Sequence, residues 1–88
     1  MNKRSNLATR IPPGLVRVQL LRILDANYTR FGLSEDVLLG LLKARLMAEP
    51  DRAEMIAALE NLSRGGMATA SHGVWRISAV GRTAAKTL

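Results

Sequence analysis

The side chains best able to carry chemistry in this 88-residue chain are seven carboxylates and a single histidine, His72. Acid–base and nucleophilic catalysis require such groups to converge on one sheltered pocket. The carboxylates fall instead near the expected ends and outer faces of helices, and no serine, histidine and acid are grouped together. Gly65-Gly66 lacks the flanking residues of a phosphate-binding loop. We therefore expect a protein that is not an enzyme.

The composition also argues against a metal site, a cofactor and a membrane span. There is no cysteine, so neither a disulfide framework nor a thiolate metal site can form. No stretch approaches the roughly 20 apolar residues that span a bilayer. Lys3 and Arg4 are not followed by the apolar run of a secretory signal. We expect a cytoplasmic protein without cofactors, and a transit peptide at the basic N-terminus is the less favoured interpretation.

Charge is the remaining chemical feature, and it is unevenly distributed along the chain. The net charge is +6, from thirteen bases and seven acids. Residues 1–22 and 64–88 together hold nine of the bases and none of the acids. Such a surplus favours a polyanionic partner, usually nucleic acid. The alternative is that the charge only keeps a small domain in solution.

The elements that must position these charges belong to one domain, because 88 residues cannot hold two cores. Residues 1–12 lack periodicity and read as a flexible basic arm, so the domain itself is expected over residues 13–88. Pro13 suits the first turn of a helix. That helix is expected to fade near Asn27, and its apolar stripe is Val16, Leu20, Ile23 and Leu24.

Two further helices are expected after a connector at residues 28–33. Ser34 is placed to cap a second helix, and Asp51 with Glu54 forms a capping-box pattern at the start of a third. Gly65-Gly66 ends the third helix at residue 64. The apolar faces of the two helices are expected to be Leu38, Leu39, Leu42 and Leu46, and then Met55, Ile56, Leu59 and Leu62.

The hydrophobic period then changes from that of a helix to that of a strand. Residues 67–70 and 74–77 are strand-length runs around a tip of Ser71, His72 and Gly73, which predicts a hairpin. Trp75 and Ile77 share one face of the second strand. Ser78 can cap a short final helix holding Val80, Ala84 and Leu88. The predicted fold is therefore α+β and mostly α: a three-helix core, a C-terminal two-stranded hairpin and a short last helix.

This order resembles the winged helix–turn–helix superfamily. The residues that carry the resemblance are Met55, Ala58-Leu59, Leu62 and Gly65-Gly66, followed by Trp75-Arg76-Ile77-Ser78 and Gly81-Arg82. The resemblance implies a winged-helix fold, with residues 51–64 as a recognition helix and the hairpin as a wing. It implies double-stranded DNA as the partner and a role as a transcriptional regulator or nucleic-acid accessory factor, in the style of a small bacterial or prophage protein.

The expected DNA contacts follow from that resemblance and from the position of the charge. The outer face of residues 51–64 carries Glu54 and Glu60 against one base, so binding should be largely electrostatic, with Asn61 and Arg64 as the candidates for base contacts. The arm and the C-terminal bases would hold phosphates. The full set of candidate contacts is Lys3, Arg4, Arg10, Arg52, Asn61, Arg64, His72, Arg76, Arg82 and Lys86.

A second interpretation comes from another class of function. Leu15, Val18 and Leu21 add apolar surface beyond the main stripe of the first helix. A homodimer or another protein partner would cover that surface, and the acidic outer face of residues 51–64 favours this interpretation. The chain would then be a winged-helix interaction module that does not bind DNA.

Overall fold

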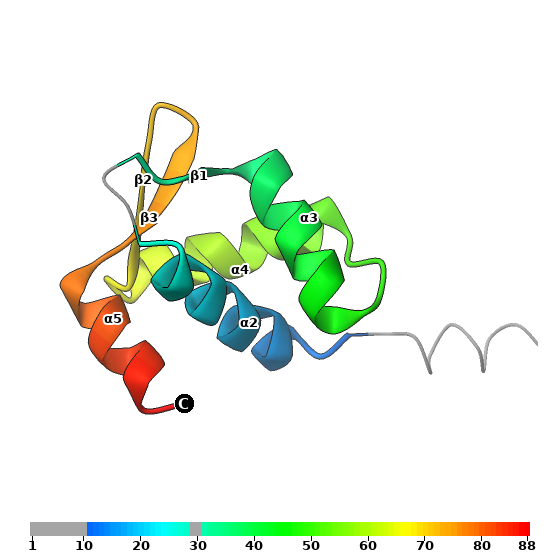
Figure 1. Ribbon diagram of the computed structural model, residues 1–88, viewed down its shortest axis with the longest axis horizontal. Helices are drawn as coiled ribbons and strands as arrows, with labels where there is room; N and C mark the ends of the chain where they lie inside the picture. The colour runs from blue at the N-terminus through cyan, green and yellow to red at the C-terminus, as the bar shows by residue number, and fades with distance from the viewer. Residues whose placement is uncertain (1–10, 29–30) are drawn as a thin grey trace, which may run out of the picture.

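The computed structural model describes residues 11–28 and 31–88. Three helices are followed by a hairpin and a short helix (Figure 1), so the predicted α+β class is confirmed, and the predicted order differs by one added strand, β1. The elements are α2 (Pro13–Ala26), β1 (Leu33–Ser34), α3 (Glu35–Leu46), α4 (Arg52–Arg64), β2 (Ala68–Ser71), β3 (Val74–Ile77) and α5 (Ala79–Lys86). The predicted arm, apart from residues 11 and 12, lies outside the described residues.

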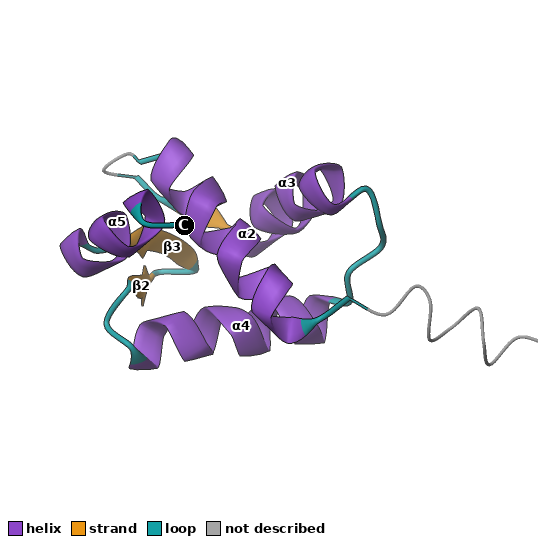
Figure 2. Ribbon diagram, turned by 90° about the horizontal axis from the view of Figure 1, so that it is seen from below, coloured by secondary structure: helices purple, strands orange, loops and turns teal. Residues whose placement is uncertain are grey.

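Helix α2 is the centre of the core. It contacts α3, α4, α5 and β3, and Figure 2 shows it lying among the other three helices. All four residues of its predicted apolar stripe are buried. Leu21 is buried as well, which corrects the expectation that it faces a second subunit, because a helix surrounded on several sides buries more than one stripe. Leu15 remains 42% exposed.

The predicted caps of α3 and α4 are both present. The Ser34 hydroxyl accepts a hydrogen bond from the Val37 N–H at 3.3 Å, and the Glu54 carboxylate accepts one from the Asp51 N–H at 3.4 Å. These side chains satisfy backbone groups that the first turn of a helix leaves unpaired. The buried residues of α3 and α4 are Leu38, Leu42, Met55, Ala58, Leu59 and Leu62. Ile56, expected in the core, is only half-buried.

The hairpin has a tighter turn than the sequence indicates. Ser71 pairs with Val74, so the turn consists of His72 and Gly73 alone rather than three residues. Both have positive φ, 54° and 80°, as a type I′ turn requires. Such a turn follows the twist of the two strands. Trp75 is buried, as expected for the face that it shares with Ile77.

The third strand, β1, is the element that the sequence does not reveal. Leu33 pairs with Trp75 and Ser34 with Val74, so the sheet order is β1-β3-β2, antiparallel throughout. Residues 28–33 are therefore only partly a connector. Gly32 enters this strand with φ 77°, and a Cβ there would lie 2.8 Å from the Trp75 carbonyl oxygen. A two-residue strand is too short to show a period of two.

Helix α5 packs through a glycine rather than through its larger apolar residues. The Ser78 hydroxyl accepts from the Gly81 N–H at 3.0 Å and so caps the helix as expected. Val80 and Leu88, expected on the apolar face, are exposed, whereas Gly81 is buried. A Cβ at Gly81 would lie 2.1 Å from the Met67 carbonyl oxygen. The close approach of α5 to the base of the hairpin therefore depends on the missing side chain.

Replacing Gly81 by alanine should destabilise the protein by about 2 kcal/mol, as overpacking of a close contact does. Because alanine is otherwise the better helix former, a loss of stability on this substitution indicates a steric clash and not a change in helix propensity. Gly40 is the matched control: it is exposed within α3, and no atom lies within 4 Å of a Cβ there. Gly40→Ala should stabilise by up to about 1 kcal/mol. Urea unfolding of the two variants measures both, and equal effects would contradict the packing described.

Candidate nucleic-acid interface

Ion pairs within the fold neutralise most of the acidic side chains. Lys43 pairs with Glu49 at 3.3 Å, Arg82 with Asp25 at 3.2 Å, and Arg52 with Glu35 at 3.6 Å. Arg52 also pairs with Asp36. Two more acids, Asp51 and Glu54, form the capping box of α4. Within residues 11–28 and 31–88, Glu60 is the acid for which neither an ion pair nor a cap is seen.

The bases are left in excess by this pairing. Within residues 11–28 and 31–88, the following have no ion pair with a described acid: Arg17, Arg22, Arg45, Arg64, Arg76 and Lys86. Arg45 is 3.5 Å from the Gln19 side-chain oxygen, through its Nη1. The field that a partner meets is thus set mainly by unpaired cations, because each internal pair cancels its own charge at a distance.

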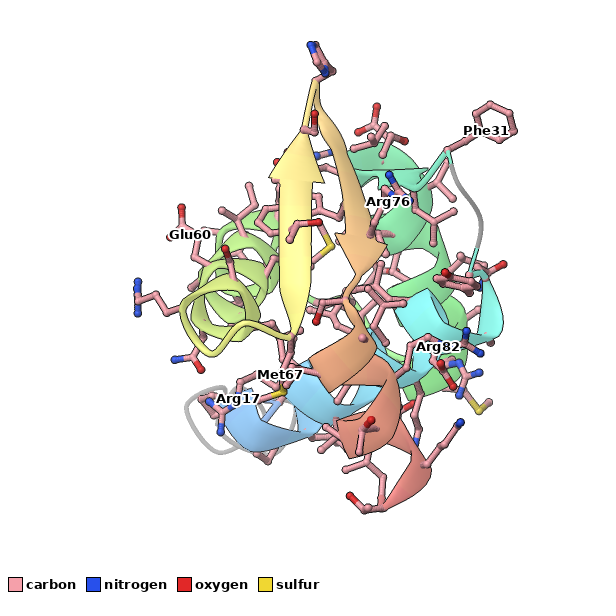
Figure 3. The ribbon with its side chains drawn as sticks, turned by 90° about the vertical axis from the view of Figure 1, so that its left-hand side faces the viewer. Arg17, Phe31, Glu60, Met67, Arg76 and Arg82 are labelled. Carbon is pink, nitrogen blue, oxygen red and sulfur yellow. The ribbon has the colours of Figure 1, made fainter. Side chains whose placement is uncertain are left out.

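The hairpin end of the molecule presents several of the predicted contacts. Arg64 is exposed at the last position of α4, Arg76 is exposed on the outer face of β3, and His72 is at the turn. Figure 3 looks onto this end, with Arg76 beside the hairpin, Arg17 below it and Glu60 to one side. Lys86 is exposed in the last turn of α5. Lys3, Arg4 and Arg10 lie outside the described residues.

Two of the residues predicted to contact DNA, Arg82 and Arg52, form ion pairs within the fold. The Arg82 side chain reaches from α5 to Asp25 near the end of α2, and its guanidinium lies 4.1 Å from the centre of the Tyr28 ring. Arg52 joins the start of α4 to the start of α3 through Glu35 and Asp36. Both arginines therefore position helices, and a phosphate would have to compete with a carboxylate for each.

The outer face of α4 is exposed, as predicted, and carries the predicted excess of acid. Its exposed residues are Ala53, Glu54, Ala57, Glu60, Asn61 and Arg64. One edge of this face borders a groove of about 230 Å³ between the start of α2 and the middle of α4. Arg17, Glu54 and Asn61 are the polar residues of the groove, and Val16 and Ala58 are among its apolar ones. The candidate base contacts Asn61 and Arg64 are accessible.

The described residues contain no cluster of three or more His, Cys, Asp or Glu side chains suited to a metal ion. Within the same part of the chain, none of the helices has the length and apolar character needed to cross a membrane.

Sequence reasoning did not single out the aromatic residues of the connector between α2 and β1. Tyr28 and Phe31 are both exposed, Phe31 strongly so. The only sequence signal was two aromatic residues in a short segment with no helical or strand period. Arg17 was also missed as a site residue, because the helical period places it on α2 without saying which side chains surround it.

His72→Asn tests whether the turn residue serves only the fold. Asparagine tolerates positive φ well, and Asn-Gly is a preferred pair for a type I′ turn. We expect the free energy of unfolding to stay unchanged or to rise by up to about 0.5 kcal/mol, the usual limit for a surface change. Thermal or urea unfolding measures this. A loss above about 1 kcal/mol would show that the imidazole, which lies 2.9 Å from the Ser71 hydroxyl, supports the hairpin.

Comparison of the chain with protein-family models, with curated proteins and with solved structures finds no match. The geometry and charge of its own residues are therefore what indicate its function.

Proposed function

We propose that this chain is a small, non-enzymatic winged-helix protein that binds double-stranded DNA as a transcriptional regulator or nucleic-acid accessory factor. One observation supports this above the others. Ion pairs within the fold engage most of the acids, whereas six of the described bases have no ion pair with a described acid. A surface of unpaired arginines and lysines attracts the phosphate backbone and releases its counterions, which supplies most non-specific DNA affinity.

Binding is expected to come mainly from the hairpin end. Arg64 and Arg76 reach phosphates there, and Asn61 offers an amide able to read an adenine edge. Glu60 lies on the same helix face and opposes close approach of α4 to a phosphate. The sequence preference should therefore be modest, with the backbone as the main determinant of affinity.

The test is fluorescence anisotropy of a labelled random duplex at two salt concentrations. Arg76→Gln should weaken binding to all sequences and lower the salt slope by about 1. Arg45→Gln is the matched control, since it removes one exposed cation from α3. We expect its effect to be smaller. Deletion of residues 1–10 should also weaken binding to every duplex alike. No binding at low salt, despite a net charge of +6, would end the proposal.

Self-association is the second candidate function, and the groove between α2 and α4 favours it. Arg17 from α2 and Glu54 from α4 give the groove opposite charges beside an apolar lining. In a two-fold dimer each surface must complement itself, and opposite charges within one patch allow this. Leu15 adds partly exposed apolar surface on α2, whereas Leu21 is buried within the chain and contributes none.

Light scattering on the purified chain decides whether this second function applies. A dimer predicts that Ala57→Arg, which puts a bulky cation into the groove, will convert it to a monomer with little loss of stability, because Ala57 is exposed. Ala53→Arg, at another exposed position of α4, is the control. A monomer at every concentration tested, or a dimer that Ala57→Arg leaves intact, would remove the groove as the interface.

A further inference from the structure

Two of the chain's three aromatic residues are exposed, and both lie in the short connector before β1. Tyr28 is 53% exposed and Phe31 is 78% exposed, whereas Trp75 is in the core. Most of the Phe31 surface is therefore open to solvent. Figure 3 shows its ring pointing away from the body of the molecule. Both side chains are therefore accessible to a partner.

The backbone fixes where Phe31 lies. The next residue, Gly32, is so close to β3 that an added Cβ would lie 2.7 Å from Arg76 Cγ and 2.8 Å from the Trp75 carbonyl oxygen. Leu33 then pairs with Trp75 in the sheet. Phe31 is thus held at the edge of the sheet, one residue away from a point of contact with the Arg76 side chain. Figure 3 shows both side chains on the same side of the hairpin.

Tyr28, at the other end of the connector, is also accompanied by an arginine. The Arg82 guanidinium lies 4.1 Å from the centre of the Tyr28 ring, a cation–π contact. Asp25 holds this arginine in place at 3.2 Å. Each of the two exposed rings thus has an arginine nearby, and the four residues Tyr28, Phe31, Arg76 and Arg82 are called here the aromatic edge.

We propose that the aromatic edge binds unpaired nucleotides, with a base stacking on Phe31 and Arg76 neutralising the adjacent phosphate. Aromatic side chains set among cations are the general means of holding single strands, because every base has a face on which a ring can stack. An intact duplex hides those faces within its own stack. The proposal rests on the proposed nucleic-acid function and narrows it to strands, ends or distorted sites that have unstacked bases.

The charge of the aromatic edge favours nucleic acid over a protein partner. Among the described residues, the acid that forms an ion pair with this group is Asp25, and its partner is Arg82. Arg76 has no ion pair with any acid in the described part of the chain. A protein partner would have to supply an acid to Arg76, whereas every nucleotide carries a phosphate. Phe31 near Arg76 therefore matches a base and its adjacent phosphate, whereas Arg82 is held by Asp25 and lies over the Tyr28 ring.

The experiment compares a labelled DNA strand of roughly 12 nucleotides, within the usual site size, with a duplex of the same length. Anisotropy titrations use the full chain and the variants Phe31→Ala and Phe31→Leu. Met47→Ala is the control, because Met47 is also a strongly exposed apolar residue but lies at the opposite end of α3 from β1. Phe31→Ala should weaken binding to the single strand roughly 5-fold to 100-fold and leave duplex binding nearly unchanged.

Leucine separates stacking from simple apolar contact. Phe31→Leu keeps an apolar side chain without a ring, so it should bind the single strand nearly as weakly as Phe31→Ala. Met47→Ala should behave as the unmodified protein. Unfolding curves that coincide for all the variants ensure that the fold is the same.

The outcomes distinguish this proposal from the broader one. Duplex binding without any effect of Phe31→Ala on the single strand overturns the aromatic edge and leaves the proposed function standing. Equal losses of single-strand affinity for Phe31→Ala and Met47→Ala overturn the aromatic edge as well. Loss of single-strand binding in Phe31→Ala alone supports it, even if the unmodified chain binds no duplex and the proposed function fails. Binding of neither nucleic acid overturns both.

Discussion

The arrangement of the hairpin relative to α4 depends on one junction, at Gly66-Met67. The Met67 N–H donates to the Leu62 carbonyl and the Gly66 N–H to that of Ser63, and Gly66 has φ 76°, which together make a Schellman end to α4. The Met67 carbonyl then accepts from the Ser78 N–H at 3.0 Å, and the Ser78 hydroxyl donates to the Gly66 carbonyl. The end of one helix, the base of the hairpin and the start of another helix are therefore fixed by the same few backbone groups. The positions of Arg64 and Arg76 relative to each other follow from this junction.

Much of the fold was predictable because its signals are local. Ser34, the Asp51–Glu54 pair and Ser78 act within three residues of themselves, and the stripe on α2 repeats over several turns. The predictions that were wrong concern contacts between segments that are far apart in the sequence. Leu21 is buried because several elements surround α2, and β1 exists because β3 offers it an edge. Neither the burial of Leu21 nor the presence of β1 produces a periodic pattern in the sequence.

The candidate site was less predictable than the fold, because charge along a sequence does not tell which charges cancel in space. Arg82 and Asp25 are 57 residues apart, yet they pair. The sequence makes Arg52 a plausible phosphate contact, but in the fold Arg52 pairs with Glu35 and Asp36. A count of bases per segment therefore overestimates the cations available to a partner, and only the folded arrangement identifies Arg76 as one that no described acid engages.

The same cancellation explains how an acidic α4 is compatible with a nucleic-acid partner. Glu54 is occupied at the helix start, which leaves Glu60 as the main source of repulsion on that face. Repulsion from one exposed carboxylate is weak at physiological salt, where the screening length is about 8 Å. Arg64, one turn further along the helix, opposes it, because residues four apart lie on the same helix face. The face keeps a small negative charge, so under the proposed function the affinity is expected to come from the hairpin and the connector beside it. Recognition by this molecule is therefore expected to depend on the edge of the sheet more than on the helix.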